Sequence, residues 1–186
     1  MQSLVFNSPD EILARVLHQP DAAARILLIT GPSGSGKTRW CLELVDSARR
    51  RGLKVAGLIS PAVFEDGRKT GINLLDVESG EQRCLARRKG TGPEGIVVGG
   101  WNLDPEVLEW GNSVLGTIRD TPILVLDEIG PLELRSNHGL NGAFGLVDSH
   151  LHRLACITIR PTLLPTALER WPSARCHTLP SPREAA

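Results

Sequence analysis

The 186-residue sequence has no excess of charge of either sign, because 21 lysines and arginines balance 21 aspartates and glutamates. A balanced chain lacks the broad electrostatic field that holds a nucleic-acid backbone or an anionic membrane. We therefore expect no nucleic-acid partner and no membrane partner. Any anion that the protein binds must be held by a local site.

The sequence also lacks Cys-x-x-Cys pairs, since its four cysteines stand far apart at positions 41, 84, 156 and 176. Neither a zinc knuckle nor a thioredoxin-type motif is indicated, and free thiols in a reducing compartment are expected. No run approaches the roughly 18–20 apolar residues that span a bilayer, and the N-terminus does not resemble a secretory signal. We expect a cytoplasmic location.

The length fits one compact domain with small additions. Ser8–Glu11 has the residue order of a helix start, and apolar residues follow at helical spacing: Ile12, Leu13, Val16 and Leu17. We expect residues 1–22 to form a helical appendage packed on the core. Residues 23–180 should form the main domain, and residues 181–186 should be a frayed tail.

Short apolar segments alternate with amphipathic ones along most of the chain. The pattern predicts buried strands at 25–30, 54–60, 123–126 and 154–159, with a weaker strand at 175–178. Helices are expected at 37–51, 105–118, 140–151 and 162–170. Strands that alternate with helices predict an α/β fold with a mainly parallel sheet and helices on both faces.

Residues 61–100 have a different pattern, in which short alternating segments are separated by glycine-containing turns. This pattern is typical of hairpins. We expect antiparallel strands near 62–65, 71–77 and 82–86, and a further one near 96–98. These strands would extend one edge of the sheet or form a flap.

A glycine-rich segment that matches GxxxxGK[ST] in full lies between the first buried strand and the helix after it. Its glycines let the backbone curl so that several N–H groups point at phosphate oxygens, and the following helix adds its positive end. The expected nucleotide-binding residues are Gly31, Pro32, Ser33, Gly34, Ser35, Gly36, Lys37 and Thr38. Lys37 supplies a mobile positive charge for the β- and γ-phosphates, and the Thr38 hydroxyl is a ligand for Mg²⁺.

Two carboxylates, Asp127 and Glu128, follow the apolar run at 123–126. Ligands of open α/β sheets lie beyond the carboxyl ends of the strands. Asp127 is therefore expected to hold Mg²⁺, through a coordinated water. Glu128 is expected to accept a proton from the attacking water or to orient it, and the alternative is that it only orders water around the metal.

The segments Thr30–Thr38 and Asp127–Leu134 together resemble the small nucleoside-triphosphatase family of P-loop NTPases, of the cancer-related nucleoside-triphosphatase type. Residues 57–61, 67–71 and 76–81 resemble the hairpin region of that family. The resemblance covers roughly residues 25–160. It departs from the family pattern at Arg39, Trp40 and Leu132, and the expected helix before residue 20 is not part of the family core.

This resemblance implies a RecA-like fold and Mg²⁺-dependent hydrolysis of several nucleoside triphosphates to diphosphates, with broad base tolerance. It implies phosphate and metal roles for Lys37, Thr38 and Asp127, and a general-base role for Glu128. Glu133 matches the second acid of the family segment. That residue either binds something at the mouth of the site or is a structural salt-bridge or capping group.

Hydrolysis benefits from one more positive charge near the transferred phosphate. Arg160 directly follows a predicted core strand and is our candidate for this catalytic role, with a structural ion pair as the alternative. Arg68 and Lys69 lie at a hairpin turn that could fold over the site. Two other functions use the same loop: a small nucleotide or metabolite kinase, and a nucleotide-dependent switch or adaptor.

Overall fold

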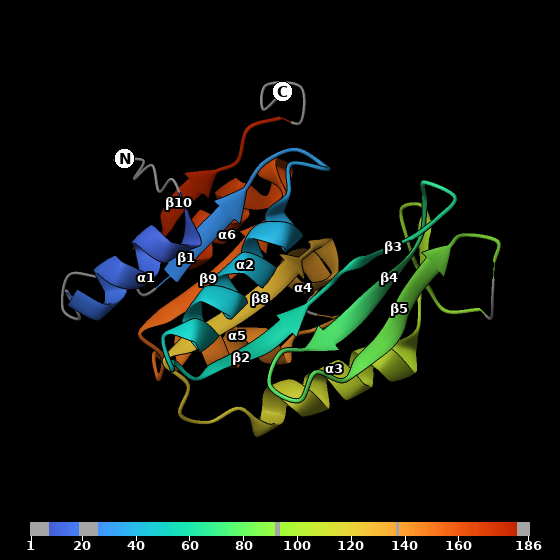
Figure 1. Ribbon diagram of the computed structural model, residues 1–186. Helices are drawn as coiled ribbons and strands as arrows, with labels where there is room; N and C mark the ends of the chain where they lie inside the picture. The colour runs from blue at the N-terminus through green and yellow to red at the C-terminus, as the bar shows by residue number, and fades with distance from the viewer. Residues whose placement is uncertain (1–7, 19–25, 92–93, 137, 182–186) are drawn as a thin grey trace.

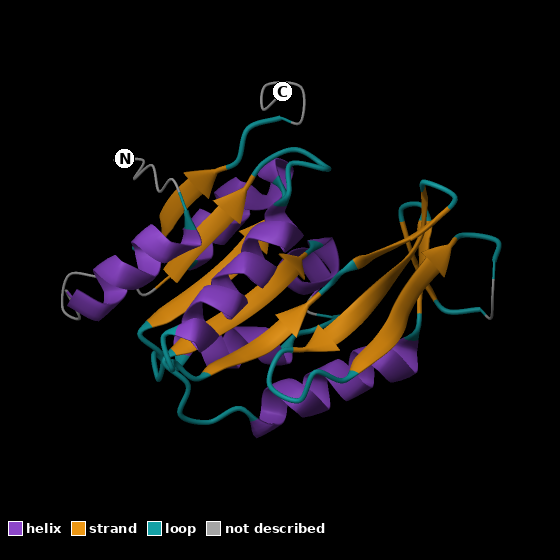
Figure 2. Ribbon diagram, viewed as in Figure 1, coloured by secondary structure: helices purple, strands orange, loops and turns teal. Residues whose placement is uncertain are grey.

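The structure is a computed structural model that describes residues 8–18, 26–91, 94–136 and 138–181. In these residues all strands belong to one ten-stranded sheet, with helices on both of its faces (Figures 1 and 2). The predicted boundary between the appendage and the main domain, at residues 22 and 23, lies outside the described residues, and so do residues 182–186 of the predicted tail. None of the described helices has the length and apolar character required to cross a bilayer.

Five parallel strands form the half of the sheet that carries the site. They are β1 (Ile26–Thr30), β2 (Val55–Ile59), β8 (Ile123–Ile129), β9 (Leu154–Ile159) and β10 (Arg175–Thr178), and they lie in the order β10-β1-β9-β8-β2. Every residue of β1, β2 and β9 is buried. Their continuous apolar sequences follow from this arrangement, because helices cover both faces of the sheet.

The helices form two layers with separate apolar cores. α1 (Pro9–His18) and α2 (Lys37–Arg50) cover one face, where their side chains pack with Leu27 and Ile29 of β1. α3 (Pro105–Thr117), α5 (Gly142–Asp148) and α6 (Leu164–Arg170) cover the other, where they pack with Ile26 and Leu28. Alternate residues of one strand thus enter opposite layers, as the pleat of a strand requires.

The predicted helix near the N-terminus is present as α1, and it packs on α2. Ile12 and Leu13 are buried in the layer beneath α2. Asp10 accepts hydrogen bonds from Ser47 and Arg51 of the α2 region. The side chains of Val16 and Leu17 lie outside the described part of the chain, so their predicted contribution to the stripe stays a prediction.

The expected hairpins continue the same sheet beyond β2. They comprise β3 (Ala62–Glu65), β4 (Arg68–Asp76), β5 (Gln82–Arg88), β6 (Ile96–Val98) and β7 (Trp101–Leu103). We call residues 61–104 the extension. β4 pairs antiparallel with β2 through Leu58↔Asp76 and Ile59↔Leu75, and the order continues as β4-β5-β7-β6, with β3 on the other side of β4. The extension therefore lengthens one edge of the sheet, and α3 packs against β4 and β5.

Four elements differ from their sequence predictions. β7 and the short helix α4 (Pro131–Ser136) were not expected. β7 forms because it pairs with both β5 and β6, which a local pattern does not reveal. β8 was expected to end at residue 126 but continues to Ile129. The helix expected at 140–151 is shortened to α5, a seven-residue helix that contains Gly142 and Gly145.

Candidate functional site

The glycine-rich segment forms a tight loop between β1 and α2. Gly31 has a φ of +147°, and a Cβ atom there would lie 2.7 Å from the Ser35 hydroxyl oxygen and 2.8 Å from the Leu179 carbonyl oxygen. Gly36, with a φ of +91°, is the N-cap residue directly before α2. Both conformations exclude ordinary side chains, which explains why the loop requires glycine at these positions.

Lys37 curls back over this loop. Its Nζ atom donates to the carbonyl oxygens of Gly31 at 2.8 Å and Pro32 at 2.9 Å. Partial burial lowers the pKa of Lys37, while the negative charges of Glu128 and Asp127 raise it. The ammonium group is therefore held inside the loop and lies in the electrostatic reach of both carboxylates.

The loop also contains a buried hydroxyl group that has no hydrogen-bond partner, that of Ser35. A buried polar group without a partner is destabilising, and such groups are uncommon in folded proteins. The N–H groups at the start of α2 lack partners within the helix, as they do at any helix start. Glycine backbone, an ammonium group, a free hydroxyl and a helix start fit the oxygens of a triphosphate.

Asp127 lies at the bottom of the site and is only 2% exposed. Its carboxylate accepts hydrogen bonds from the Thr158 hydroxyl at 2.7 Å and from the Ser60 backbone N–H at 3.1 Å. Burial raises the pKa of Asp127, and the hydrogen bonds from Thr158, Thr38 and Ser60 oppose that shift. The Thr38 hydroxyl thus lies close enough to the Asp127 carboxylate to lower its pKa, although the two residues are distant in the sequence.

Glu128 lies in a β-bulge, where the pairing of β8 with β9 shifts between Leu126 and Ile129. Its φ of +63° is left-handed, a conformation that is unfavourable for a residue with a side chain. The Thr158 hydroxyl accepts a hydrogen bond from the Glu128 backbone N–H at 2.6 Å, and this contact supports the bulge. Bulges commonly redirect a side chain beside an active site.

The Glu128 carboxylate forms an ion pair with Arg160, whose Nη2 atom lies 2.6 Å from Oε1. Arg160 directly follows β9, the strand that pairs with β8. The two predicted catalytic residues are therefore brought together by neighbouring strand ends. The positive charge of Arg160 also lowers the pKa of Lys37, so all four charged groups belong to one site.

Mg²⁺ prefers oxygen ligands and keeps several of its waters when it binds protein carboxylates. Thr38 and Asp127 provide a hydroxyl and a buried carboxylate that lie near each other. The carboxylate is almost fully buried, and no lysine or arginine of the described part of the chain forms a salt bridge with it, which leaves its charge to be balanced by a cation. The residues present therefore fit the predicted metal.

Sequence reasoning missed two residues that hold the carboxylates. Thr158 bridges Asp127 and the backbone of Glu128, and Ser60 donates its backbone N–H to Asp127. Thr158 is 0% exposed and is the polar member of an otherwise apolar strand. A hydroxyl group inside such a run was a usable signal, because a buried hydroxyl requires a partner.

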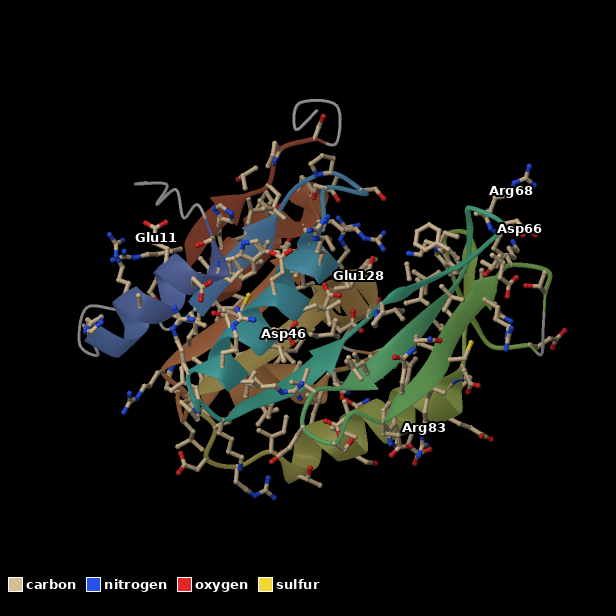
Figure 3. All side chains as sticks on the ribbon, in the orientation of Figure 1. Glu11, Asp46, Asp66, Arg68, Arg83 and Glu128 are labelled. Carbon is tan, nitrogen blue, oxygen red and sulfur yellow. The ribbon has the colours of Figure 1, made fainter. Side chains whose placement is uncertain are left out.

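Two other predicted residues lie away from the reacting groups. Glu133 is buried, and its carboxylate accepts hydrogen bonds from the backbone N–H groups of Gly130 and Leu140, each at 2.9 Å. Of its two interpretations, these hydrogen bonds match the structural one, in which Glu133 is a capping group. Arg68 lies at the outer tip of the extension, far from Glu128 in Figure 3. The proposed approach of Arg68 to the site is not seen.

The sequence of this chain is similar to those of known nucleoside-triphosphatases. A model of the NTPase family matches residues 26–168. Nucleoside-triphosphatase THEP1 of Ignicoccus hospitalis is 40% identical over 109 residues, which are 59% of this chain and 61% of that protein. The enzyme of the same name from Thermofilum pendens is 33% identical over 138 residues, 73% of this chain and 74% of that protein.

The solution structure of a human cancer-related nucleoside triphosphatase has the same fold. It superposes with a TM-score of 0.62 at 23% identity and covers 83% of this chain and 88% of its own. The predicted P-loop NTPase fold and the predicted family are thereby confirmed. With its matching loop, its sheet order and the family model over residues 26–168, the chain belongs to the NTPase family.

Proposed function

We propose that the protein catalyses Mg²⁺-dependent hydrolysis of nucleoside triphosphates to nucleoside diphosphate and phosphate. The observation that carries this proposal is the convergence of the phosphate loop with two carboxylates and an arginine. Lys37 is within the electrostatic reach of Asp127, Glu128 and Arg160. Phosphoryl transfer needs little beyond such positioned charges and a positioned nucleophile.

The loop binds the triphosphate. Lys37 exchanges the carbonyl oxygens of Gly31 and Pro32 for phosphate oxygens, and the Ser35 hydroxyl gains a partner. Thr38 and Asp127 hold the metal, directly or through its waters. When bound, Mg²⁺ neutralises charge on the phosphates.

Glu128 orients the attacking water and accepts its proton. The bulge fixes the backbone of this residue, and Arg160 fixes one carboxylate oxygen, which leaves Oε2 for the water. Arg160 also places a positive charge beside the region where the γ-phosphate must lie. Hydrolysis then needs no group beyond the site except the triphosphate, water and the metal.

The residues that we assign to the site also support broad tolerance for the base. Every residue that we assign to the site addresses phosphate, metal or water, and none of them addresses the base. Phosphate release should therefore be measurable with ATP, GTP, CTP and UTP at comparable rates. A strong preference for one base would contradict this part of the proposal.

The decisive experiment is the substitution Glu128→Gln, which keeps the shape of the side chain and removes its basicity. We expect the turnover number to fall roughly 10²- to 10⁴-fold, the usual contribution of a general base, while triphosphate affinity stays within about twofold. Glu43→Gln is the matched control, because Glu43 pairs with the exposed Arg39 on α2. Full activity in Glu128→Gln would remove Glu128 from the mechanism.

The kinase alternative gains support from one observation, a cavity that is lined by Glu128 and by none of the loop residues 31–38. A kinase and a hydrolase differ only in the nucleophile that attacks the γ-phosphate. The identity of that nucleophile therefore decides between the two functions.

A further inference from the structure

A cavity of about 360 Å³ lies where the extension meets the carboxyl ends of the parallel strands. It shares Ser60, Glu128 and Arg160 with the candidate site, and none of residues 31–38 lines it. The cavity therefore adjoins Glu128 without including the loop that we assign to the triphosphate. A molecule bound there would meet Glu128 and not the phosphate loop.

The size of the cavity exceeds what a nucleophilic water requires. One water occupies about 30 Å³ in the liquid, whereas pockets for small molecules are typically about 300–1,000 Å³. The cavity falls in the second range. It has room for a molecule of several rings beside the carboxylate that we assign as the base.

The walls of the cavity are mostly apolar. Ile72 and Leu85 come from the extension, Leu108 from α3, and Leu140 from the segment before α5. All four are buried side chains of one apolar cluster. A ligand that fills this space must therefore present a largely apolar body.

Trp101 adds a large flat surface to the same cavity. Its indole ring is held by two cations, with Lys69 Nζ at 5.0 Å and Arg88 Cζ at 5.8 Å from the ring centroid. Aromatic rings pack favourably against other planar rings, and cations above a ring fix its position. A fixed indole in an apolar cavity favours a planar ligand.

The charged side chains that line the cavity are those of Glu128, Arg160 and Glu133. Glu128 and Arg160 lie together as an ion pair, whereas the carboxylate of Glu133 already accepts two backbone hydrogen bonds. A ligand with an apolar planar body and a polar group at one end would direct that polar group at Glu128. A hydroxyl group is the polar group that suits a carboxylate base.

We propose that this cavity binds a second substrate, a planar and largely apolar small molecule whose hydroxyl group is a phosphoryl acceptor. This inference rests on the proposed roles of the loop and of Glu128. Glu128 accepts the hydroxyl proton, the acceptor oxygen forms a bond to the γ-phosphorus, and the bond from that phosphorus to the β,γ-bridging oxygen breaks. The products are a phosphate ester and the nucleoside diphosphate, and hydrolysis is the same step with water in place of the acceptor.

The first test asks whether the cavity binds such a molecule. The probe is 1-anilinonaphthalene-8-sulfonate, which has planar apolar rings and an anionic group to pair with Arg160, and its fluorescence reports binding. Gly100 lines the cavity, is not left-handed, and a Cβ atom there meets nothing within 4 Å, so the turn accepts a side chain. We expect saturable one-site binding that Gly100→Trp weakens roughly tenfold or more by filling the space.

Gly100→Ala is the matched control, because it changes the backbone preference equally and adds only a methyl group. It should bind the probe within about twofold of the natural protein. Val98→Trp fills the cavity from a second position and should repeat the loss. Triphosphate affinity confirms that each variant is folded. Equal probe affinity in all four proteins would overturn the assignment of the cavity.

The second test asks whether the bound molecule is an acceptor. The protein is incubated with γ-labelled ATP and, one at a time, adenosine, guanosine, pyridoxine, riboflavin and thiamine, each of which joins a planar ring to a group that carries a hydroxyl. We expect a labelled organic phosphate with at least one of them, and its loss in Gly100→Trp. Release of inorganic phosphate alone with every compound would overturn the acceptor role.

The failure of this inference differs from the failure of the proposed function. If the proposed function is wrong, labelled phosphate is not released even without an added compound. If only the inference is wrong, water continues to act as nucleophile and no ester is formed. A compound that accelerates phosphate release without becoming phosphorylated is an effector, and that result also overturns the acceptor role.

Discussion

The parallel core and the antiparallel extension belong to one sheet but follow different rules. In the core, β1, β2 and β9 are buried along their whole length. In the extension, β3 and β6 are mostly exposed, and Phe64 and Val97 are 64% and 53% exposed. The core has helices on both faces, whereas α3 covers one face of β4 and β5.

The core and the extension contribute differently to the site. The core carries the charged groups of the site, because parallel strands deliver their carboxyl ends to one edge of the sheet. The extension carries none of the residues that we assign to phosphate or metal, and it contributes walls to the neighbouring cavity. Changes in the core should therefore alter chemistry, and changes in the extension should alter what lies beside it.

The largest expected effect tests the first half of this comparison. Lys37→Ala removes the ammonium group of the loop, and charge-assisted hydrogen bonds contribute about 2–3 kcal/mol, so triphosphate affinity should fall roughly 30- to 150-fold. Arg83→Ala removes a cation of the extension and should leave affinity unchanged, because Arg83 pairs with Glu81. Isothermal titration measures both. Unchanged affinity in Lys37→Ala would refute the loop assignment.

A smaller effect is expected at Thr158, which we propose as a positioning residue. Thr158→Val keeps the shape but loses the hydroxyl that contacts Asp127 and the Glu128 backbone. The turnover number should fall roughly 10- to 100-fold, in proportion to a lost buried hydrogen bond to a charged group, with little change in affinity. Thr158→Ser restores the hydroxyl and should recover most of the activity. If Thr158→Ser is as slow as Thr158→Val, the hydroxyl is not what matters.

Hydrogen exchange sharpens the comparison without any substitution. Backbone amides of β1 and β9 are covered on both faces, so they should exchange only in large unfolding events. Paired amides of β6 and β7 should exchange at least about tenfold faster, since β6 is the edge strand and both strands have only three residues, so that they open locally. Mass spectrometry of peptides measures both sets. Equal protection would show that core and extension unfold as one unit.

The smallest expected effect is on the stability of the protein at acidic pH. His177 of β10 is buried and lies 5.9 Å from the ring of Trp40, and burial lowers the pKa of His177 below its usual 6.5. The folded protein therefore binds this proton less readily than the unfolded chain, so stability is present above pH 6.5 and falls as pH drops through the folded pKa.

His177→Gln should accordingly lose less thermal stability than the natural protein between about pH 7 and pH 5. Melting curves at both values measure this. Residues 61–104 contain no histidine, so the extension should not contribute to the difference. An identical loss in both proteins would exclude His177 as a source of acid sensitivity.

Sequence reasoning succeeded where the information is local. The phosphate loop is a continuous segment whose glycines, lysine and threonine each have a chemical reason, and the buried strand before it and the helix after it are present. The pair Asp127-Glu128 was also identified from its place after an apolar run. The catalytic roles of Lys37, Glu128 and Arg160 stay predictions until the variants are measured.

Sequence reasoning failed where a neighbouring strand decides the outcome. The bulge at Glu128 depends on the hydroxyl of Thr158, 30 positions further along the chain. The ion pair of Glu128 with Arg160 follows from β8 lying beside β9, which no local pattern specifies. Likewise, Trp101–Leu103 becomes a strand only because β5 and β6 lie on either side of it.

The join between β2 and β4 consists of two residue pairs, Leu58↔Asp76 and Ile59↔Leu75. Strands of the extension can be gained, lost or lengthened without any change in the pairing of the five parallel strands. Such variation would change the part of the cavity lining that the extension contributes and leave the loop at residues 31–38 unchanged. Related chains could therefore acquire new ligands by altering the extension, while they keep the phosphate loop and the carboxylates that we propose for hydrolysis.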